Sequence, residues 1–490
     1  MTAALDDVRP EPPGRTGGVA CVPTPGGGRA EHPQQFHPDD RSPDAVLDRQ
    51  RRRESSARTY ARTFPIVPVR ADGMVVVGAD GRRYLDCLSG AGTLALGHNH
   101  PVAREAIERV LRSGAPLHAL DVATPEKDDF TTALLETLPR ALADRARVHF
   151  CGPAGTDAVE AALKLTRLAT GGRQVLAFTG AYHGMTSGAL GVTADAALRG
   201  HSGGQDVYRL PYPYAYRCPF GIGGERGADV AAAYAAAMLA DSHSGIVQPA
   251  AMILEPVQGE GGVVPAPDAF LVALRRTTRE HGVPLVVDEV QTGAGRTGTF
   301  WGVDRSGVVP DVMVLSKAIG GSLPLAVIVY TDDLDVWPAG AHTGTFRGNQ
   351  LAMAAGAATL REITAAGLAG RAEEAGALLT RGLRELQARH ASFGDVRGRG
   401  LMLGVEIVAP DAEPDALGAR PPAPALARAI RHECLERGLI VELGGRQGAV
   451  VRLLPPLVIT DDQVDAVLQR LAGAVAAAEA AHGRGETPPS

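Results

Sequence analysis

The chain has 490 residues, of which 45% are hydrophobic and 21% charged, and its formal net charge is −6. This length exceeds what one hydrophobic core usually organises, so a large domain and a smaller one are expected. The composition is typical of globular proteins rather than disordered or membrane proteins, and the negative charge argues against a nucleic-acid partner.

The first segment, residues 1–50, combines Pro, Gly, Asp and Arg without apolar periodicity. Such a composition cannot repay the entropy of ordering, so we expect a disordered tail, and the absence of an apolar signal core argues against secretion. Further on, Met74 to Val77, a Gly-rich turn and Arg82 to Asp86 predict a β-hairpin. Residues 51–104 are therefore expected to form the N-terminal part of a small domain.

Residues 105–369 are expected to form a large domain in which helices alternate with short, fully apolar strands. Strands of this kind are covered on both faces, which predicts an α/β fold with a mainly parallel sheet between helices. The predicted strands are Val175 to Phe178, Met252 to Leu254, Leu285 to Val287 and Val312 to Leu315. The longest apolar run, Val230 to Ala240, falls short of the ~20 residues that span a membrane, so no membrane partner is expected.

Residues 370–478 return to helix and then alternate with two strands, Leu401 to Ile407 and Val450 to Leu454. We expect the C-terminal part of a small α+β domain there, followed by a flexible tail over residues 479–490. The five cysteines are scattered and show no CxxC spacing, which predicts neither disulfides nor a zinc or other metal site, and fits a reducing cytoplasm.

Two polar residues follow predicted strands of the large domain, where functional groups gather in sheets of this kind. Lys317 comes directly after Val312 to Leu315, and partial burial there favours the neutral amine that Schiff-base chemistry needs. Asp288 ends another strand and supplies an anion suited to a pyridinium nitrogen. The alternatives are a surface lysine that extends into solvent and an aspartate that caps a turn.

Two further segments suit a flat, phosphorylated cofactor. Gly152 to Asp157 opens a predicted helix, and the exposed N–H groups of such a start bind phosphate, although Asp157 alone could serve the first turn. Tyr182, followed by His183, offers a ring that can stack on a cofactor, the alternative being a core tyrosine and a structural histidine.

Taken in order, these segments resemble the class III (ω-amino acid) aminotransferases of the fold-type I pyridoxal-phosphate (PLP) enzymes, from about Ser56 to about Val475. The matching motifs are SGAGTLALGHNHP (89–101), GPAGTDAVEAALK (152–164), AYHG (181–184), EPVQGEGG (255–262), VDEVQTGAGRTG (287–298), SKAIGG (316–321) and TFRGNQLAMAA (345–355). The resemblance implies a large domain with a mixed, mainly parallel seven-stranded sheet, and a small domain built from both chain ends.

The resemblance also implies roles for individual residues. Lys317 forms an imine with pyridoxal 5′-phosphate and moves a proton, while Asp288 holds the pyridinium nitrogen. The other cofactor-binding residues that it implies are Gly155 and Thr156 at the phosphate, Tyr182 on the ring, His183 beside it, Gln291 near the phenolic oxygen, and Thr345. In the family, a threonine at the position of Thr345 reaches the phosphate of the neighbouring subunit, so a homodimer with shared active sites is expected.

Two residues concern the substrate. Arg452 resembles the arginine that grips the α-carboxylate of glutamate and 2-oxoglutarate, and a planar guanidinium suits this bidentate contact. Glu260 resembles the glutamate that pairs with this arginine when an ω-amino substrate occupies the site. The alternative for Arg452 is a structural ion pair at a strand end.

Arg347, Gln350 and the GAGT of residues 90–93 depart from the common pattern of the family. They resemble the branch that transfers the terminal amine between L-2,4-diaminobutyrate and 2-oxoglutarate, yielding aspartate 4-semialdehyde and glutamate, as in ectoine or siderophore biosynthesis. The alternatives are another ω-aminotransferase acting on ornithine, 4-aminobutyrate or a diamine, a PLP-dependent racemase or aminomutase, and a noncatalytic binding protein with the same fold.

Overall fold

The structure is a computed structural model that describes residues 42–200 and 206–484. The chain divides into two compact units, Met1–Glu54 and Ser55–Ser490. In the first unit, the described residues form helix α1 (Pro43–Arg53), which begins with a proline and is capped by the Ser42 side chain, an acceptor for the N–H of Ala45.

This helix differs from the expected disordered tail over residues 1–50. Residues 1–41 lie outside the described part of the chain, but Pro43 to Gln50 are helical. The local signal of serine, proline and an acidic first turn starts a helix that the overall composition of the segment does not suggest.

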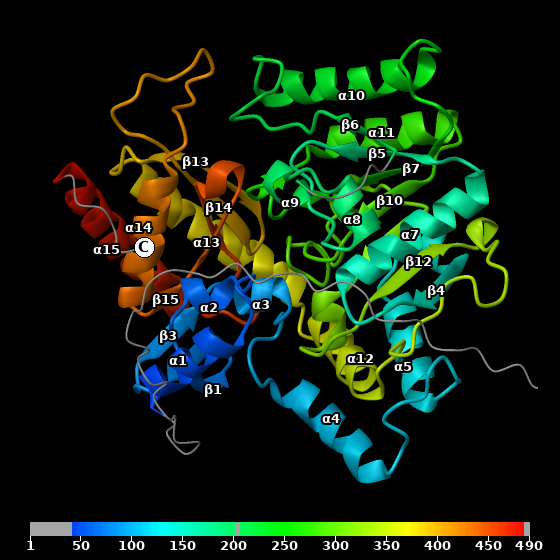
Figure 1. Cartoon of the computed structure of the whole chain (residues 1–490), viewed down its shortest axis with the longest axis horizontal. Coiled ribbons are helices and arrows are strands. Elements are labelled where there is room, and N and C mark those ends of the chain that lie inside the picture. Colours follow the sequence, from blue (N-terminus) through cyan, green and yellow to red (C-terminus); the bar gives the residue numbers. More distant parts are fainter. Residues whose placement is uncertain (1–41, 201–205, 485–490) are drawn as a thin grey trace, which may run out of the picture. The chain divides into compact units, whose positions relative to one another are not determined.

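The second unit is built around a seven-stranded sheet with the strand order β4-β12-β11-β10-β7-β5-β6 (Figure 1). Its strands are β4 (Ala146–Phe150), β5 (Gln174–Phe178), β6 (Val207–Leu210), β7 (Pro249–Leu254), β10 (Leu285–Asp288), β11 (Val312–Leu315) and β12 (Val327–Thr331). Only β12 runs antiparallel to its neighbours, β11 and β4. The predicted α/β class and mainly parallel, mixed sheet are confirmed.

Helices cover both faces of this sheet. Alternate residues of β10 show why: Val286 joins the cluster under helix α7, and Val287 joins the cluster under α11 and α12. The helices of this region are α5 (Pro125–Leu135), α6 (Arg140–Ala143), α7 (Gly155–Thr170), α8 (Ser187–Val192), α9 (Ala196–Arg199), α10 (Gly224–Ala240), α11 (Asp268–Glu280) and α12 (Gln350–Ala365). Helices α7 and α8 pack on one face and α5, α10, α11 and α12 on the other, and each large side chain buried in this way stabilises the fold by roughly 1.5–3 kcal/mol.

A four-stranded sheet joins two segments that lie far apart in the sequence. Its strands are β1 (Pro68–Asp72), β2 (Val75–Gly78), β3 (Arg83–Asp86) and β15 (Leu439–Ile440). Strands β2 and β3 form the predicted hairpin, and β15 pairs with β3 in parallel. The pairing connects the two segments expected to form one small domain, whose boundaries stay a prediction. Nearby in sequence lie α2 (Tyr60–Thr63), α3 (Ser89–Gly92) and α4 (Pro101–Ser113).

A second four-stranded sheet, wholly antiparallel, lies in the C-terminal part with the order β13-β14-β17-β16. Its elements are β13 (Phe393–Arg399), β14 (Met402–Ile407), β16 (Glu442–Gly444) and β17 (Val450–Leu453), with helices α13 (Leu368–Gln387), α14 (Pro424–Glu436) and α15 (Asp461–Gly483). Helix α15 extends to Gly483, past the expected start of a tail at residue 479, because its apolar stripe continues through the buried Ala478. Residues 485–490 lie outside the described residues.

The remaining short elements are the strand pair β8 (Val257–Gln258) and β9 (Val264–Pro265) and the 3-10 turns η1 (Asp304–Ser306), η2 (Lys317–Gly320), η3 (Asp332–Leu334) and η4 (Arg446–Gly448). No helix within residues 42–200 and 206–484 is both long and apolar enough to cross a bilayer.

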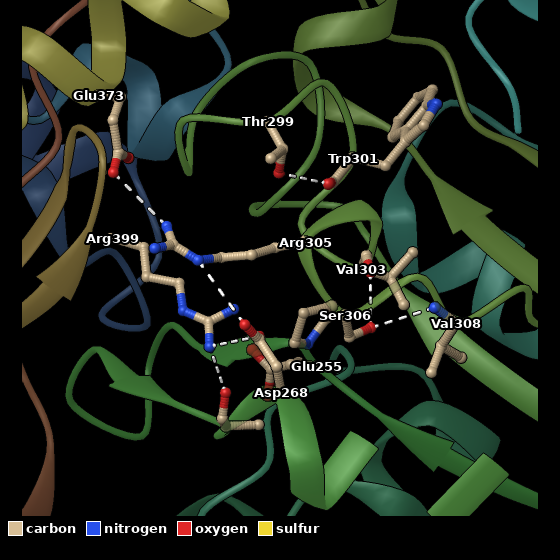
Figure 2. A network of polar contacts seen from close by, with 12 residues as sticks. Glu255, Asp268, Thr299, Trp301, Val303, Arg305, Ser306, Val308, Glu373 and Arg399 are labelled. Carbon is tan, nitrogen blue, oxygen red and sulfur yellow. Dashed lines mark hydrogen bonds and ion pairs between the residues drawn. The ribbon is translucent and has the colours of Figure 1, made fainter. Parts of the chain in front are cut away.

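An ion-pair network links the C-terminal sheet to the helices of the large sheet (Figure 2). Asp268, at the start of α11, accepts from Arg399 of β13 at 2.9 Å and lies 3.7 Å from Arg305 of η1. Arg305 in turn approaches Glu373 of α13 at 3.5 Å. Because most of these side chains are partly exposed, each pair contributes about 0–1 kcal/mol, and the network serves mainly to orient the elements.

Candidate active site

Lys317 lies two residues past the carboxyl end of the buried strand β11, at the first position of η2. Its backbone has φ +52°, a conformation that non-glycine residues seldom adopt and that tertiary contacts must hold. Burial lowers the pKa of the Lys317 amine, although the negative charges of Glu260 and Asp288 oppose this effect. The neutral, nucleophilic form of the amine is thereby favoured.

Asp288 is the last residue of β10, the strand next to β11, and it forms a buried pair with His183. One carboxylate oxygen lies 2.8 Å from His183 Nδ1, and the other accepts from the N–H of Val290 at 3.0 Å. Burial acts to lower the pKa of His183, but the hydrogen bond and the charge of Asp288 outweigh it, so that the pKa is raised. The pair presents a rigid anion whose orientation the imidazole maintains.

Glu255 follows β7, the neighbour of β10 on its other side, and sequence reasoning assigned it no role. Its two oxygens accept from the N–H groups of Tyr182 at 3.0 Å and Gly259 at 2.9 Å. Burial raises the pKa of Glu255 to about 7. Its position directly after a buried strand, the same signal that identified Asp288, is what points to it in the sequence.

The N-terminus of helix α7 forms a compact anion cradle. Gly155 is its first residue, and the hydroxyl of Thr156 lies 2.6 Å from that of Thr186 and accepts from the Thr186 N–H at 3.2 Å. Gly184 closes over this turn with φ +128°, and a Cβ there would overlap the Thr156 hydroxyl. Free N–H groups, a hydroxyl and the helix dipole together suit a phosphate.

The cradle adjoins the strand ends. A Cβ at Gly155 would lie 3.0 Å from Val290 and 3.5 Å from Ser316, the neighbours in sequence of Gln291 and Lys317. Gln291 donates to the carbonyl of Ala91 at 3.0 Å. Its Oε1 is buried without a hydrogen-bond partner among the described residues, so it is free for a ligand.

Arg452 of β17 and Glu260 form a bidentate ion pair. The two guanidinium N–H groups donate to the two carboxylate oxygens at 2.7 and 3.0 Å. The side chain of Arg452 is 1% exposed, whereas that of Glu260 is 36% exposed and lines, with Tyr182, a cavity of about 620 Å³. Burial acts to lower the pKa of Arg452, but Glu260 and Glu442 outweigh it and the pKa is raised, which keeps the guanidinium charged.

The structure thus gathers almost all the predicted site residues at the carboxyl edge of the sheet. They are Lys317, Asp288, Gly155, Thr156, Tyr182, His183, Gln291, Glu260 and Arg452. Thr345 is the exception, because it is exposed in the segment before α12 and forms no hydrogen bond with these residues in the part of the chain that the structure describes. The arrangement combines a neutral amine, a fixed anion, an anion cradle and a paired arginine, which suits a flat phosphorylated cofactor and a carboxylate substrate.

Comparison with known proteins identifies the family of this chain. Residues 55–475 match the family described as aminotransferase class-III. The diaminobutyrate–2-oxoglutarate aminotransferase of Rhizobium meliloti (strain 1021) is 56% identical, over 87% of this chain and 92% of the relative. Its namesake in Haemophilus influenzae (strain ATCC 51907 / DSM 11121 / KW20 / Rd) is 47% identical, over 86% of this chain and 93% of the relative.

Among solved structures, the amine transaminase of an uncultivated Pseudomonas species in its PLP-bound form superposes with a TM-score of 0.78. It is 30% identical and covers 91% of this chain and 99% of its own. These similarities extend over the whole of the large sheet and both smaller ones, and they confirm the resemblance seen in the sequence motifs. The chain belongs to the class-III aminotransferases.

Proposed function

We propose that this chain transfers the terminal amine between L-2,4-diaminobutyrate and 2-oxoglutarate, with pyridoxal 5′-phosphate as cofactor. Relatives 56% and 47% identical over most of their length carry that activity in their names. The bidentate pair of Arg452 and Glu260 supports this choice of substrates. A buried arginine whose carboxylate partner can be exchanged suits two substrates that bind in turn.

The residues at the strand ends fit the cofactor. Asp288, oriented by His183, would hold the protonated ring nitrogen, while Gly155 and Thr156 would bind the phosphate through N–H groups and a hydroxyl. Gln291, whose buried Oε1 has no hydrogen-bond partner among the described residues, and the aromatic ring of Tyr182 would complete the cofactor site. When bound, pyridoxal phosphate supplies an electron sink for the carbanion formed at the substrate carbon.

Lys317 would hold the cofactor through its amine and would move a proton at the substrate carbon. Its lowered pKa supports both tasks, since a neutral amine attacks a carbonyl and accepts a proton. Borohydride reduction followed by peptide mapping is expected to locate the covalent link at Lys317, and the substitution Lys317→Ala to remove it. A link that persists in this variant would move the assignment to another lysine.

Glu260 acts as the mobile partner of Arg452. When glutamate or 2-oxoglutarate enters, its carboxylate takes the guanidinium and Glu260 turns toward the cavity that it already lines. When diaminobutyrate presents its terminal amine, Glu260 stays on Arg452 and neutralises it. The partial exposure of Glu260 beside a fully buried Arg452 supports this division of roles.

We further propose a homodimer with shared active sites. Thr345 is exposed next to Phe346, whose side chain is 72% exposed and contacts His118 at 5.4 Å between ring centroids. The end of α4 and the segment between α4 and α5 add further exposed apolar residues: Leu111, Leu117, Leu120 and Val122. Such a patch beside an otherwise complete site is typical of a subunit interface.

A cytoplasmic location is part of the proposal. The cysteines of the described residues, Cys87, Cys151, Cys218 and Cys434, are free thiols, as is usual for proteins of a reducing compartment.

The proposal is tested by incubating the purified protein with pyridoxal phosphate, 2-oxoglutarate and one amine at a time: diaminobutyrate, ornithine, 4-aminobutyrate or an aliphatic diamine. We expect glutamate and aspartate 4-semialdehyde from diaminobutyrate at the highest kcat/KM. A higher kcat/KM for another amine would replace diaminobutyrate as the substrate. A product that forms without any oxo acid would indicate a racemase or aminomutase.

A further inference from the structure

Glu442 is a largely buried carboxylate beside the ion pair of Arg452 and Glu260, and it takes no part in their bidentate contact. It lies on β16, directly opposite Arg452 in the antiparallel register with β17. Its side chain is 13% exposed, and its Oε2 lies 3.9 Å from the guanidinium of Arg452. That oxygen is buried and accepts no hydrogen bond from the described residues.

Arg452 compensates the charge of Glu442 in part but donates no hydrogen bond to its Oε2. Glu260 already takes two of the arginine's N–H groups at 2.7 and 3.0 Å, and the Oε2 of Glu442 lies 3.9 Å from the guanidinium, beyond hydrogen-bonding distance. Arg431 of α14 adds positive charge near Glu442 but donates no hydrogen bond to its Oε2. A buried, unpaired acceptor is costly, and it persists where a ligand supplies the missing donor.

The surroundings of Glu442 place it beside the substrate site. The hydroxyl of Tyr60 is hydrogen-bonded to the Glu442 carboxylate, and burial together with Glu442 raises the pKa of that phenol. The neighbours of Glu442 on β16, Leu443 and Gly444, line the same cavity as Tyr182 and Glu260, the partner of Arg452. Glu442 therefore lies at the edge of the site that Arg452 and Glu260 form.

We propose that Glu442 selects a diamino acid by accepting a hydrogen bond from the α-ammonium group of diaminobutyrate. This inference rests on the proposed function and names the part of the substrate that Glu442 recognises. With the terminal amine at Lys317, the α-ammonium lies at the other end of the carbon chain, and it offers N–H donors with a charge opposite to that of Glu442. An ω-amino acid without this group, such as 4-aminobutyrate, leaves Glu442 unpaired and is rejected.

The test compares diaminobutyrate with 4-aminobutyrate, which differs from it only by the α-amine, in the wild type and in Glu442→Gln. In the wild type, we expect a strong preference for diaminobutyrate. In the variant, kcat/KM for diaminobutyrate falls about 10- to 100-fold, mainly through KM, as for the loss of one hydrogen bond to a charged group. The value for 4-aminobutyrate falls much less, so the ratio of the two collapses.

The matched control is Glu436→Gln, which changes a half-exposed carboxylate at the end of α14 that pairs with Arg82. It is expected to leave the substrate ratio as in the wild type. A Glu442→Gln variant that loses both substrates equally, or keeps the wild-type ratio, would overturn the assignment of Glu442. If instead the wild type itself fails to convert diaminobutyrate, the proposed function is wrong, and that assay alone shows it.

Discussion

Individual side chains at the strand ends carry the chemistry, and Asp288 is the clearest case. We expect its charge, oriented by His183 at 2.8 Å, to keep a bound pyridine ring protonated. Asp288→Asn retains the shape and the contact with His183 but removes the charge. We expect kcat to fall roughly 10²- to 10³-fold, as when a single electrostatic stabiliser is removed from an active site.

The measurement pairs steady-state kinetics with the absorbance of the bound cofactor. Cofactor content is expected to equal that of the wild type, because the phosphate cradle and Lys317 are unchanged. Normal turnover by Asp288→Asn would show that the carboxylate does not serve the ring nitrogen.

The neighbour of Asp288, Glu289, predicts a pH dependence of stability. It is buried and accepts from the N–H of Gly302 at 2.9 Å, from the N–H of Val303 at 2.8 Å and from the Thr292 hydroxyl. Burial nevertheless raises its pKa to about 7 from an ordinary value of 4.5. The folded protein therefore holds this proton where the unfolded chain has lost it, and the free energy of unfolding falls as the pH rises from 4.5 to 7.

For Glu289→Gln in the cofactor-free protein, we expect this fall to be shallower by up to about 1.4 kcal/mol per pH unit. The quantity to compare is the slope of the free energy of unfolding between pH 5 and 7, measured by urea unfolding. The loss of the hydrogen-bond acceptor itself shifts this free energy equally at every pH and leaves the slope unchanged. Glu280→Gln, an exposed carboxylate on α11, serves as the control and should keep the wild-type slope. An unchanged slope in Glu289→Gln would contradict the raised pKa.

The sequence predicted the residues of the site at the ends of continuous apolar strands, such as Lys317 and Asp288, since the strand pattern and the residue type are both local signals. Glu442 was missed for a physical reason: β16 has only three residues, and its place beside Arg452 arises from a long-range pairing. Glu255 could have been predicted, because it directly follows a buried strand, but it was identified only as part of the motif EPVQGEGG.

At the scale of the element, the position of Lys317 depends on how closely helix α12 approaches η2. Gly356 lies in the middle of α12, where a Cβ would overlap the carbonyl oxygen of Ile319 and press on the ring of Phe130. Gly356→Ala is therefore expected to lower the free energy of unfolding by about 1–3 kcal/mol, despite the better helix propensity of alanine. The displacement of η2 should also lower kcat.

Gly370 of α13 provides the matched control, because nothing lies within 4 Å of a Cβ built there. Gly370→Ala is expected to raise stability by about 0.5–1 kcal/mol and to leave kcat unchanged. Thermal unfolding measures the stability of the two variants, and steady-state kinetics measures their kcat. Equal effects of the two substitutions would show that the approach of α12 to η2 is not tight.

The elements themselves were largely predictable, but their directions and partners were not. The strands of the large sheet are continuous apolar runs, which look alike in parallel and antiparallel neighbours, so the reversal of β12 leaves no mark in the sequence. Strand β15 has only two residues, and it pairs with β3, which lies far away in the sequence: Leu439 is paired with Leu85. Helix α1 was missed because the composition of residues 1–50 was weighted above the capping signal at Ser42.

At the scale of the whole molecule, the site is expected to be complete only when two chains meet. Within one chain, Thr345 is exposed and forms no hydrogen bond with Gly155 or Thr156 among the described residues. Two inactive variants, Lys317→Ala and Thr345→Ala, test whether Thr345 serves the site of its partner or the site of its own subunit. In a mixed dimer of Lys317→Ala and Thr345→Ala subunits, one site has an intact Lys317 and receives an intact Thr345 from its partner, whereas the other has neither.

Random mixing makes half of the dimers mixed, so about one quarter of wild-type activity is expected to return, from two preparations that are each nearly inactive. The measurement is kcat per subunit after co-refolding at equal concentrations, with each variant refolded alone as the control. If Thr345 served the site of its own subunit, every site in the mixture would lack one of the two residues, and the activity would stay at the average of the two variants.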